Sequence, residues 1–457
     1  MPQHSTDHRS GHSGSCVLIT GTLTAAVTLA MLTTSAQAFD ARSIALGGSA
    51  VAHGIGVNGA IENPASLTGM KRRGDTAHFL LGAAIDARDH GELVEILLDD
   101  DNRDLADDLE AEIENVSGSS IEPECSTAAF IPPTQNTVCL RGTQQLAVLA
   151  DDAISLLNDI DGQPIEALGE GQTGFAVTNT PLPFAVHLGA RATGYGVVNV
   201  DDNDRQYVND FVTIMEDDEV TFGEIDSSAR FTIENGTFNV DQPEDVISST
   251  GEGAMMSRVQ LGVSLATSVE LADYSVDLGV TPKFSRLTAM GLQAQLSETF
   301  NDSSVPFEDQ LEDSEVEESS FTFDIGASTQ LPALPVRLSA VLRNVVPESI
   351  ETNNGFEFET TPQLIVGALH QRENLSLMAS LAINTAELDG IDTHPVALGV
   401  EYDTGLLAVR GGLSADLGRD DDVVALSAGI KLGPLEVGGR LSGVNQGQIG
   451  AQLSFGF

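Results

Sequence analysis

The chain has 457 residues, a hydrophobic fraction of 41% and a formal net charge of −47, from 21 basic and 68 acidic residues. This length admits one large barrel or two or three smaller domains. The excess of acids argues against a nucleic-acid partner, because phosphate binding requires clustered Lys and Arg. Two explanations of the acidity stay open: a solvated surface adapted to high salt, and divalent-cation binding at an outer rim.

The N-terminus has the features of a secretory signal peptide. A polar leader precedes an apolar core from about Val17 to Leu32, and Ala36-Gln37-Ala38 is an A-x-A cleavage site. We therefore expect residues 1–38 to form a signal peptide that is cleaved between Ala38 and Phe39. The mature protein would then be exported.

Two cysteines remain after this cleavage, Cys125 and Cys139. An even pair in an exported chain predicts a disulfide. Closing a loop of this size is worth about 3 kcal/mol in the chain-entropy model.

The segment that follows, residues 39–75, is rich in glycine and alanine. Gly47-Gly48 permits close backbone approach or a positive φ, and the Asn63-Pro64 step marks a turn. The segment is too short, and its residues are too small, to form a core of its own. It is therefore predicted to be a plug inside a larger structure, which residues 76–457 would form.

The first expected strand, His78 to Asp86, is followed by a change of period. Apolar residues recur at helical spacing from Leu93 to Val116 and again from Gln144 to Leu157, and the cysteine pair lies between these stretches. We expect residues 88–171 to form a partly helical extracellular insertion that carries the disulfide. Residues 200–256 form a second acidic insertion, with weak strand signals near 211–215 and 231–240.

From Val259 onward the apolar residues alternate steadily with polar or small ones. This period of two predicts strands with one apolar face, and strands of about ten residues suit a tilted bilayer crossing. Short turns alternate with longer links, as in bacterial outer-membrane barrels. Phe455 and Phe457 end the last strand and are the predicted signal for the barrel-assembly machinery.

These segments predict an all-β fold, a transmembrane antiparallel β-barrel. Eleven strands follow Val259, and strands near 78, 174 and 184 raise the total to about fourteen. The alternative is sixteen strands, if the weak strands within 200–256 also cross the membrane.

Two short sequences carry a family resemblance: ARSIALGGSAVA at residues 41–52 and ENPASL at residues 62–67. With the signal peptide and the barrel pattern, they resemble the conjugal-transfer TraF-like family of outer-membrane proteins, which is related to the FadL-type long-chain fatty acid transporters. The resemblance implies a 14-stranded barrel that is occluded by its N-terminal segment and passes hydrophobic molecules. It implies a plug motif made of Gly47, Gly48, Asn63, Pro64 and Ala65.

Charged residues lie on the polar faces of the expected strands and are predicted to point into the lumen. A positively lined lumen could bind a carboxylate, and the alternative is cross-strand ion pairing that fills the barrel and anchors the plug. His53, within the plug, could contact substrate or be a hydrogen-bonded packing histidine. The predicted lumen residues are Arg191, Arg286, Arg343, Arg410, Arg440, Lys283, Lys431, Glu401, Asp416 and Glu436.

No residue pattern indicates catalysis or a bound metal. None of the histidines stands in a ligand spacing such as HExxH, and no nucleophile is paired with a base. The acidic runs 99–101 and 420–422 lack the ligand order of a calcium-binding loop. We expect neither an enzyme nor a cofactor.

The sequence therefore predicts a channel in the outer membrane of a Gram-negative bacterium for passive uptake of small hydrophobic or amphipathic molecules. Its expected partners are outer-membrane lipid, a hydrophobic small molecule and the barrel-assembly machinery. The alternative function is a structural or interaction protein of the conjugal-transfer type whose acidic extracellular cap binds a partner.

Overall fold

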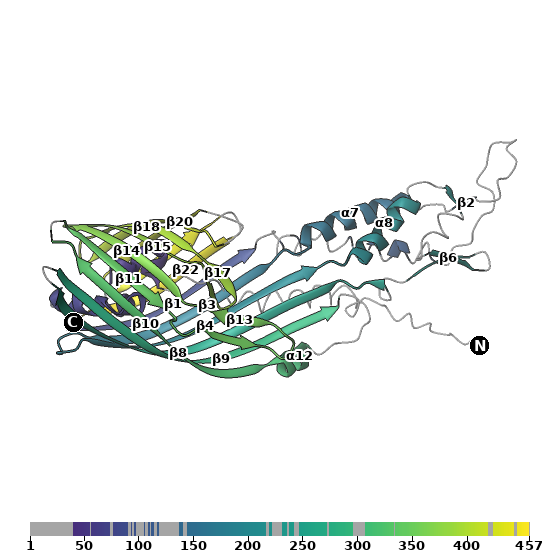
Figure 1. The fold of residues 1–457 in the computed structure, drawn as a ribbon. Coiled ribbons are helices and arrows are strands. Elements are labelled where there is room, and N and C mark those ends of the chain that lie inside the picture. Colours follow the sequence, from purple (N-terminus) through teal and green to yellow (C-terminus); the bar gives the residue numbers. More distant parts are fainter. Residues whose placement is uncertain are drawn as a thin grey trace, which may run out of the picture.

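The structure of the protein is a computed structural model. It describes residues 40–456 apart from gaps that lie mainly within 90–143, 216–245, 296–306, 419–423 and 443–445, with short gaps at 55, 74–75, 272–273 and 333. The predicted signal peptide and its cleavage site between Ala38 and Phe39 lie outside the described residues. Figure 1 shows a barrel at one end of the molecule and a narrower arm that extends from it.

Fourteen antiparallel strands close into one barrel, as the sequence predicts. The first strand pairs with the last, with His78 opposite Gly456, and also with the second barrel strand, with Ala77 opposite Val177. The strands are β1 (Ala77–Asp89), β3 (Ile165–Val177), β4 (Phe184–Asn199), β8 (Thr250–Leu271), β9 (Tyr274–Gln295), β10 (Val316–Gln330), β11 (Val336–Arg343), β14 (Gln363–Arg372), β15 (Leu375–Ala382), β18 (Pro395–Asp403), β19 (Leu407–Asp416), β20 (Ala425–Leu432), β21 (Leu435–Leu441) and β22 (Gln446–Gly456).

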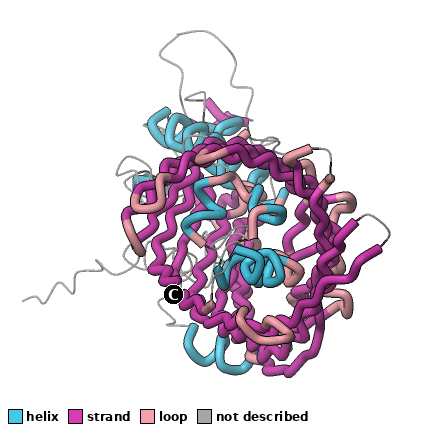
Figure 2. The backbone as a smooth tube through the Cα atoms, turned by 90° about the vertical axis from the view of Figure 1, so that its left-hand side faces the viewer, coloured by secondary structure: helices cyan, strands magenta, loops and turns pink. Residues whose placement is uncertain are grey.

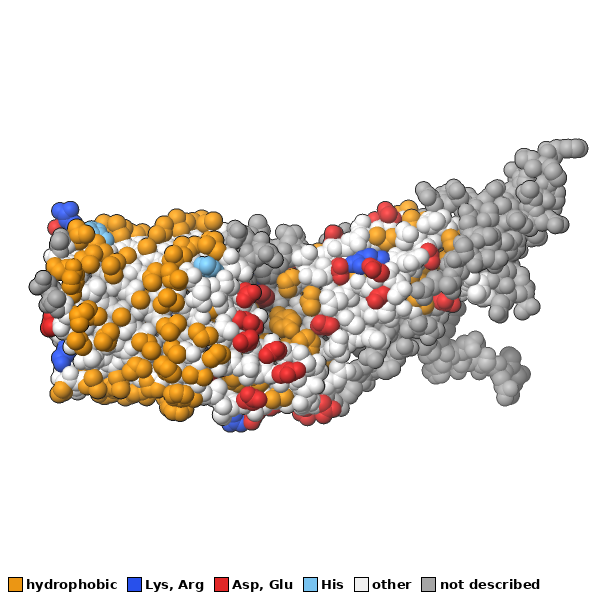
Figure 3. Space-filling model, viewed as in Figure 1, with side chains coloured by type: hydrophobic (Ala, Val, Ile, Leu, Met, Phe, Trp, Pro, Cys, Tyr) orange, Lys and Arg blue, Asp and Glu red, His pale blue; other side chains and the backbone are white. Residues whose placement is uncertain are grey.

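The alternation predicted from the sequence puts large apolar side chains on the outside of the barrel. Ile85 is 62% exposed, Leu426 64% and Ile449 54%. Figure 3 shows such side chains as a belt around the barrel, with acidic side chains gathered on the arm side of the belt. Small and polar residues of the same strands face inward, which leaves room in the lumen for other parts of the chain.

Strand length differs strongly around the barrel. β8 and β9 each have 22 residues, whereas β20 has 8. At about 3.3 Å per residue, the long strands extend far beyond the belt that the short strands define. These extensions form one side of the arm.

The N-terminal segment lies inside the barrel, where Figure 2 shows its short helices within the ring of strands. Asp40 caps the first helix by accepting hydrogen bonds from the backbone N–H groups of Arg42 and Ser43, both at 2.9 Å. Its elements are α2 (Ala41–Ala45), η1 (Ser49–Ala52), α3 (Gly56–Glu62) and α4 (Ser66–Arg73).

The arm has a hydrophobic core of its own. The core is formed by α7 (Gln144–Ile160), α8 (Asp202–Met215) and the hairpin of β6 (Phe231–Glu234) and β7 (Thr237–Val240). Phe211 lies at its centre, with its ring 5.0 Å from that of Tyr207 and 5.1 Å from that of Phe231. No helix in the described part of the chain is long and apolar enough to cross a membrane.

The alternative of sixteen barrel strands is wrong. Residues 211–215, which have a weak strand signal, belong to helix α8, and residues 231–240 form the β6–β7 hairpin outside the barrel. Apolar residues at 207, 208, 211 and 214 face the arm core at helical spacing, so the helical period overrides the local strand signal.

Two links predicted only as long connections contain further hairpins. One is formed by β12 (Glu348–Glu351) and β13 (Glu357–Thr360), and the other by β16 (Ala386–Leu388) and β17 (Ile391–Thr393). The remaining two-stranded sheet joins β2 (Thr137–Cys139) to β5 (Glu219–Thr221), and α12 (Phe307–Ser314) precedes β10.

Candidate functional site

The lumen is the candidate functional site, and the plug occupies one end of it. Glycines of the barrel wall allow the plug backbone to approach closely: a Cβ at Gly412 would lie 2.5 Å from the carbonyl carbon of Leu46, and one at Gly438 would overlap the carbonyl oxygen of Ala41. The wall therefore packs against the plug as a protein core does, with backbone against backbone.

The predicted plug motif makes two kinds of contact. Gly47 and Gly48 have φ values of 67° and 90°, which only glycine adopts without strain, and they turn the chain between α2 and η1. The Asn63 side chain accepts a hydrogen bond from the N–H of Ala65 at 3.1 Å and donates to the carbonyl of Ala340 at 3.3 Å. Pro64 lies against Gly279, where an added Cβ would collide with the plug.

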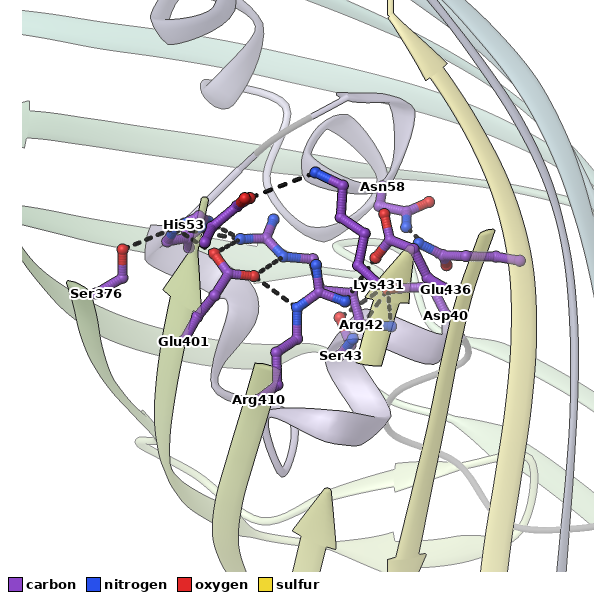
Figure 4. A network of polar contacts seen from close by, with 12 residues as sticks. Asp40, Arg42, Ser43, His53, Asn58, Ser376, Glu401, Arg410, Lys431 and Glu436 are labelled. Carbon is purple, nitrogen blue, oxygen red and sulfur yellow. Dashed lines mark hydrogen bonds and ion pairs between the residues drawn. The ribbon is translucent and has the colours of Figure 1, made fainter. Parts of the chain in front are cut away.

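An ion-pair network fixes α2 to the wall (Figure 4). The Arg42 Nε and Nη2 atoms donate to the two oxygens of Glu401 at 3.1 and 2.9 Å. Arg410 donates from Nε to Glu401 at 2.6 Å and from Nη1 to Glu436 at 2.7 Å. All four side chains are less than a tenth exposed. The wall contributes two carboxylates, Glu401 and Glu436, but only one guanidinium, Arg410. The second positive charge comes from Arg42 of the plug, which binds Glu401.

His53 belongs to the same network. Its ring contacts the Arg42 guanidinium, and its Nε2 atom lies 3.4 Å from Glu401 Oε1 and 3.4 Å from the Ser376 hydroxyl (Figure 4). The histidine is buried. It therefore lies in the interface between plug and wall, which corresponds to the packing role that the sequence left open.

A second set of ion pairs continues around the lumen. Arg343 pairs with Glu62 of α3. Lys283 lies 2.7 Å from Asp324 and donates to Asn344 at 2.8 Å. By alternation, Arg440 lies on the inward face of β21 together with Glu436.

The predicted lumen position of Arg286 is wrong. Its side chain is 65% exposed and pairs with Glu317 on the outside of the barrel, at 2.6 Å. Lys283 and Arg286 are three positions apart on β9, and because side chains alternate between the two faces of a strand, these two point to opposite faces. Phe284, 59% exposed, marks the outward face.

The other end of the lumen is occupied by the two hairpins, β12–β13 and β16–β17. At the tip of β16–β17, the Asp389 carboxylate lies 2.8 Å from Arg191 Nε and 2.7 Å from Arg258 Nη2. Arg258 also donates to Glu348 of β12 at 2.8 Å. The Thr360 hydroxyl donates to Asp389 at 3.0 Å and joins the two hairpins.

Between the plug and the hairpins lies a layer of wall residues with free space beside it. Gly189 faces inward between His187 and Arg191, and a Cβ added there would meet no atom of the described residues within 4 Å. Its cross-strand neighbours are Gln172 and Gln260. In the layer below, by contrast, a Cβ at Gly174 would meet Val57 of the plug. The lumen is therefore not completely filled at the level of Gly189.

Several predicted residues are not tested by the structure. Cys125 lies outside the described residues and Cys139 ends β2, so the disulfide stays a prediction. Phe455 lies on β22 opposite Phe79, and Phe457 lies outside the described residues. Within the described part of the chain, no group of three or more His, Cys, Asp or Glu residues could hold a metal ion.

Sequence reasoning missed Asp389 and Arg258. The signal for Asp389 is the Asp389-Gly390 pair, since Asp-Gly is favoured in a two-residue hairpin turn. Both residues have positive φ, 55° and 83°, and Leu388 pairs with Ile391 across the turn. Arg258 lies one residue before Val259, where the regular alternation was predicted to begin.

Comparison with solved structures gives distant matches. The toluene transporter TodX of P. putida is 11% identical, with a TM-score of 0.43, over 92% of this chain and 99% of that chain. A Pseudomonas aeruginosa FadL homologue is 11% identical, with a TM-score of 0.41, over 93% of this chain and 97% of that chain. No curated protein matches the chain.

Comparison with protein families gives one match that covers more than two thirds of the chain. The sequence model of the family described as "F plasmid transfer operon, TraF, protein" matches residues 60–381. The match begins in α3 of the plug and ends in β15, so it includes Arg191, Arg258 and the β12–β13 hairpin, whereas β16–β17 and the last five barrel strands lie beyond it. The chain therefore belongs to this TraF family.

Proposed function

We propose that this protein is a channel in the bacterial outer membrane for passive passage of small hydrophobic or amphipathic molecules. The observation that carries the proposal is the open space beside Gly189, between the plug and the inward hairpins, where an added Cβ would meet no atom of the described residues within 4 Å. A barrel with a purely structural role would gain stability by filling this space with side chains. Free space between two closures is what a solute pathway requires.

The outer surface supports a place in a membrane. Burying apolar surface is worth about 25 cal/mol per Å², so a continuous apolar belt on a barrel calls for lipid around it. The 8 residues of β20 span about 26 Å along the strand, which a tilt of about 35–45° reduces to about 20 Å across the membrane, within the apolar band of about 25 Å that is usual for such barrels. With the predicted signal peptide, this indicates assembly in the outer membrane, with the short turns in the periplasm and the arm outside.

Next to the free layer, the hairpins bring apolar residues into the lumen. Ile350 and Phe358 of β12–β13 pack against Met256 and Leu287 of the wall. A solute that enters from outside would meet this apolar cluster before it reaches the layer at Gly189. Passage to the periplasm then requires rearrangement of the plug or a gap beside it.

Lipid extraction followed by mass spectrometry tests the proposal. The full chain is purified, exchanged into detergent and extracted. We expect a stoichiometric apolar or amphipathic molecule in the extract, and uptake of octanol into vesicles that contain the protein. Vesicles with heat-denatured protein are the control. A barrel that is empty on extraction and does not accelerate uptake would contradict the channel.

A second function is favoured by a specific observation, the separate hydrophobic core of the arm. The helices α7 and α8 extend beyond the barrel (Figure 1) and are not needed to close it. Such an arm could bind a partner during cell contact. Deleting the arm would then abolish contact-dependent function and leave uptake intact.

A further inference from the structure

The arginine pair at the hairpin end suggests which solutes the proposed channel admits, so this inference rests on the proposed function. Arg191 and Arg258 lie directly opposite each other on β4 and β8 and face the same side. Like charges directly opposite each other in a sheet destabilise it. The pair therefore requires an anion, and the chain provides one in Asp389.

The cations and the anion belong to different parts of the fold. The two arginines belong to strands with continuous hydrogen-bonded neighbours on both sides. Asp389 belongs to a turn between two strands of three residues each, β16 and β17. This turn is hydrogen-bonded to β13, from the Gly390 N–H to the Glu359 carbonyl at 2.9 Å, and not to a barrel strand. Displacement of the hairpins would therefore carry the anion away and leave the cations on the wall.

Removing the hairpins would leave an excess of positive charge on the wall. Among the described residues of the neighbouring wall strands, Glu170 of β3 carries the carboxyl group that lies directly opposite Arg191. Glu348 and Asp389 both come from the hairpins. The Nε atom of Arg258 is buried and makes no hydrogen bond within the described part of the chain. Arg258 thus keeps one donor that neither Asp389 nor Glu348 uses.

The surroundings of the pair suit an amphiphile. Leu287 lies directly opposite Arg258 on β9, and Met256 follows on the same inward face of β8. Both belong to the apolar cluster that the β12–β13 hairpin covers. The free layer at Gly189 adjoins the pair on its other side.

We propose that Arg191 and Arg258 form a binding site for the anionic head of an amphipathic solute, and that Asp389 fills this site when no solute is bound. The β16–β17 hairpin is then a strap that an organic carboxylate displaces. Arg258 contacts the head group directly, and Asp389 acts as its competitor. A neutral hydrophobic molecule makes no ion pair with the two arginines, so its binding should not depend on the charge of Asp389.

Substitutions with opposite expected effects test this proposal. Octanoate binding to the full-length protein in non-ionic detergent is measured by calorimetry, with octanol as the neutral probe. Asp389→Asn removes the competing charge and should tighten octanoate binding about tenfold, and Arg258→Gln should weaken it about tenfold. Asp392→Asn is the matched control, because Asp392 is exposed on the same hairpin and should leave binding unchanged.

A merely structural role for Asp389 predicts that both substitutions weaken binding, because both break the same ion pair. Unchanged or weaker octanoate binding by D389N therefore overturns the proposal, and so does unchanged binding by R258Q. Heat-dependent migration in gels verifies that each variant forms the barrel. If R258Q does not fold, the direction of the D389N effect decides alone.

The measurements with octanol separate this inference from the proposed function. If octanol binds and crosses vesicle membranes but octanoate binding does not depend on Asp389, the channel stands and the anion site is wrong. If neither molecule binds or crosses, the channel itself is wrong.

Discussion

The two ends of the lumen are closed in different ways. At the plug end, glycines of the wall lie against the plug backbone, and Arg42 enters a buried network with Glu401 and Arg410. At the hairpin end, the short β16–β17 turn is attached to the wall arginines by one carboxylate, that of Asp389. The first closure resembles a protein core, and the second resembles a latch.

The two closures should differ in the free energy needed to open them. Releasing the plug exposes closely packed backbone and leaves several buried charges without partners, which costs far more than moving one turn. Moving the β16–β17 turn away from the wall breaks the ion pairs of one carboxylate, and moving it away from β13 breaks a few hydrogen bonds, among them that from the Gly390 N–H to the Glu359 carbonyl at 2.9 Å. We therefore expect the hairpin end to open at lower cost, and the predictions below test this contrast.

The largest effect is expected from Arg410→Met. This change leaves Glu401 and Glu436 without their shared cation and should lower the free energy of unfolding by about 3–5 kcal/mol. Guanidinium unfolding in lipid vesicles measures it, together with faster hydrogen exchange in residues 41–53. Arg286→Met is the matched control and should leave stability unchanged, because Arg286 pairs in solvent on the outside of the barrel. Equal losses from both changes would contradict the plug network.

A smaller effect is expected from Gly438→Val. The new side chain would collide with Ala41 of the plug, and overpacking of this kind costs about 1–3 kcal/mol. We expect a displaced plug and a higher ion conductance in planar bilayers. The control is Gly439→Val: a Cβ at that position would have its nearest contact at 3.6 Å. If both variants conduct like the wild type, close packing at Gly438 does not keep the plug in place.

A third effect concerns the helix cap. Asp40→Ala removes the acceptor for two N–H groups of α2 and should cost about 1 kcal/mol. Burial raises the pKa of the Asp40 carboxyl, and the Glu62 carboxylate adds to this. The stability that depends on this group is therefore present below its ordinary pKa and is lost as pH rises through the raised value. Asp40→Asn keeps the acceptor without the charge, so at neutral pH it should slow hydrogen exchange in α2 relative to the alanine variant.

The smallest effect is expected from mild acid at the hairpin end. Burial by itself raises the pKa of the Asp389 carboxyl, but the Arg191 and Arg258 guanidiniums outweigh it and hold the pKa below its usual range. The contribution of this carboxylate is present above the ordinary Asp pKa of about 3.9 and is lost only as pH falls through the lower folded value. Conductance should therefore stay constant from about pH 7 to pH 5. A rise with a midpoint in that interval would show that the latch opens by protonation.

Much of the barrel could be predicted from residue patterns. The period of two after Val259 and the alternation of short and long connections were sufficient for the strand count of fourteen. The double glycine and the Asn63-Pro64 step predicted a segment that packs inside the barrel. These features are local, because strand period and turn chemistry depend on neighbouring residues.

The partners of the lumen charges could not be predicted in the same way. Arg258 meets Asp389 across 131 residues, and Arg42 meets Glu401 across 359. Seven cations were predicted to face the lumen, yet the sequence could not tell which carboxylate each one meets. Arg286 is not among the lumen residues, because the alternation of side chains along β9 places it on the outer face. Ion pairs form between groups that folding brings together, so the partners in each pair depend on strand register and on the position of the hairpin tip in the folded barrel.

The sequence by itself determined the class of fold, the plug and the positions of most wall charges, because alternation and turn residues act over a few residues of chain. Only the tertiary structure decided that two links fold back into the lumen and that Asp389 lies between two arginines. The physical reason is that a link becomes a closure only when the barrel provides a surface to receive it.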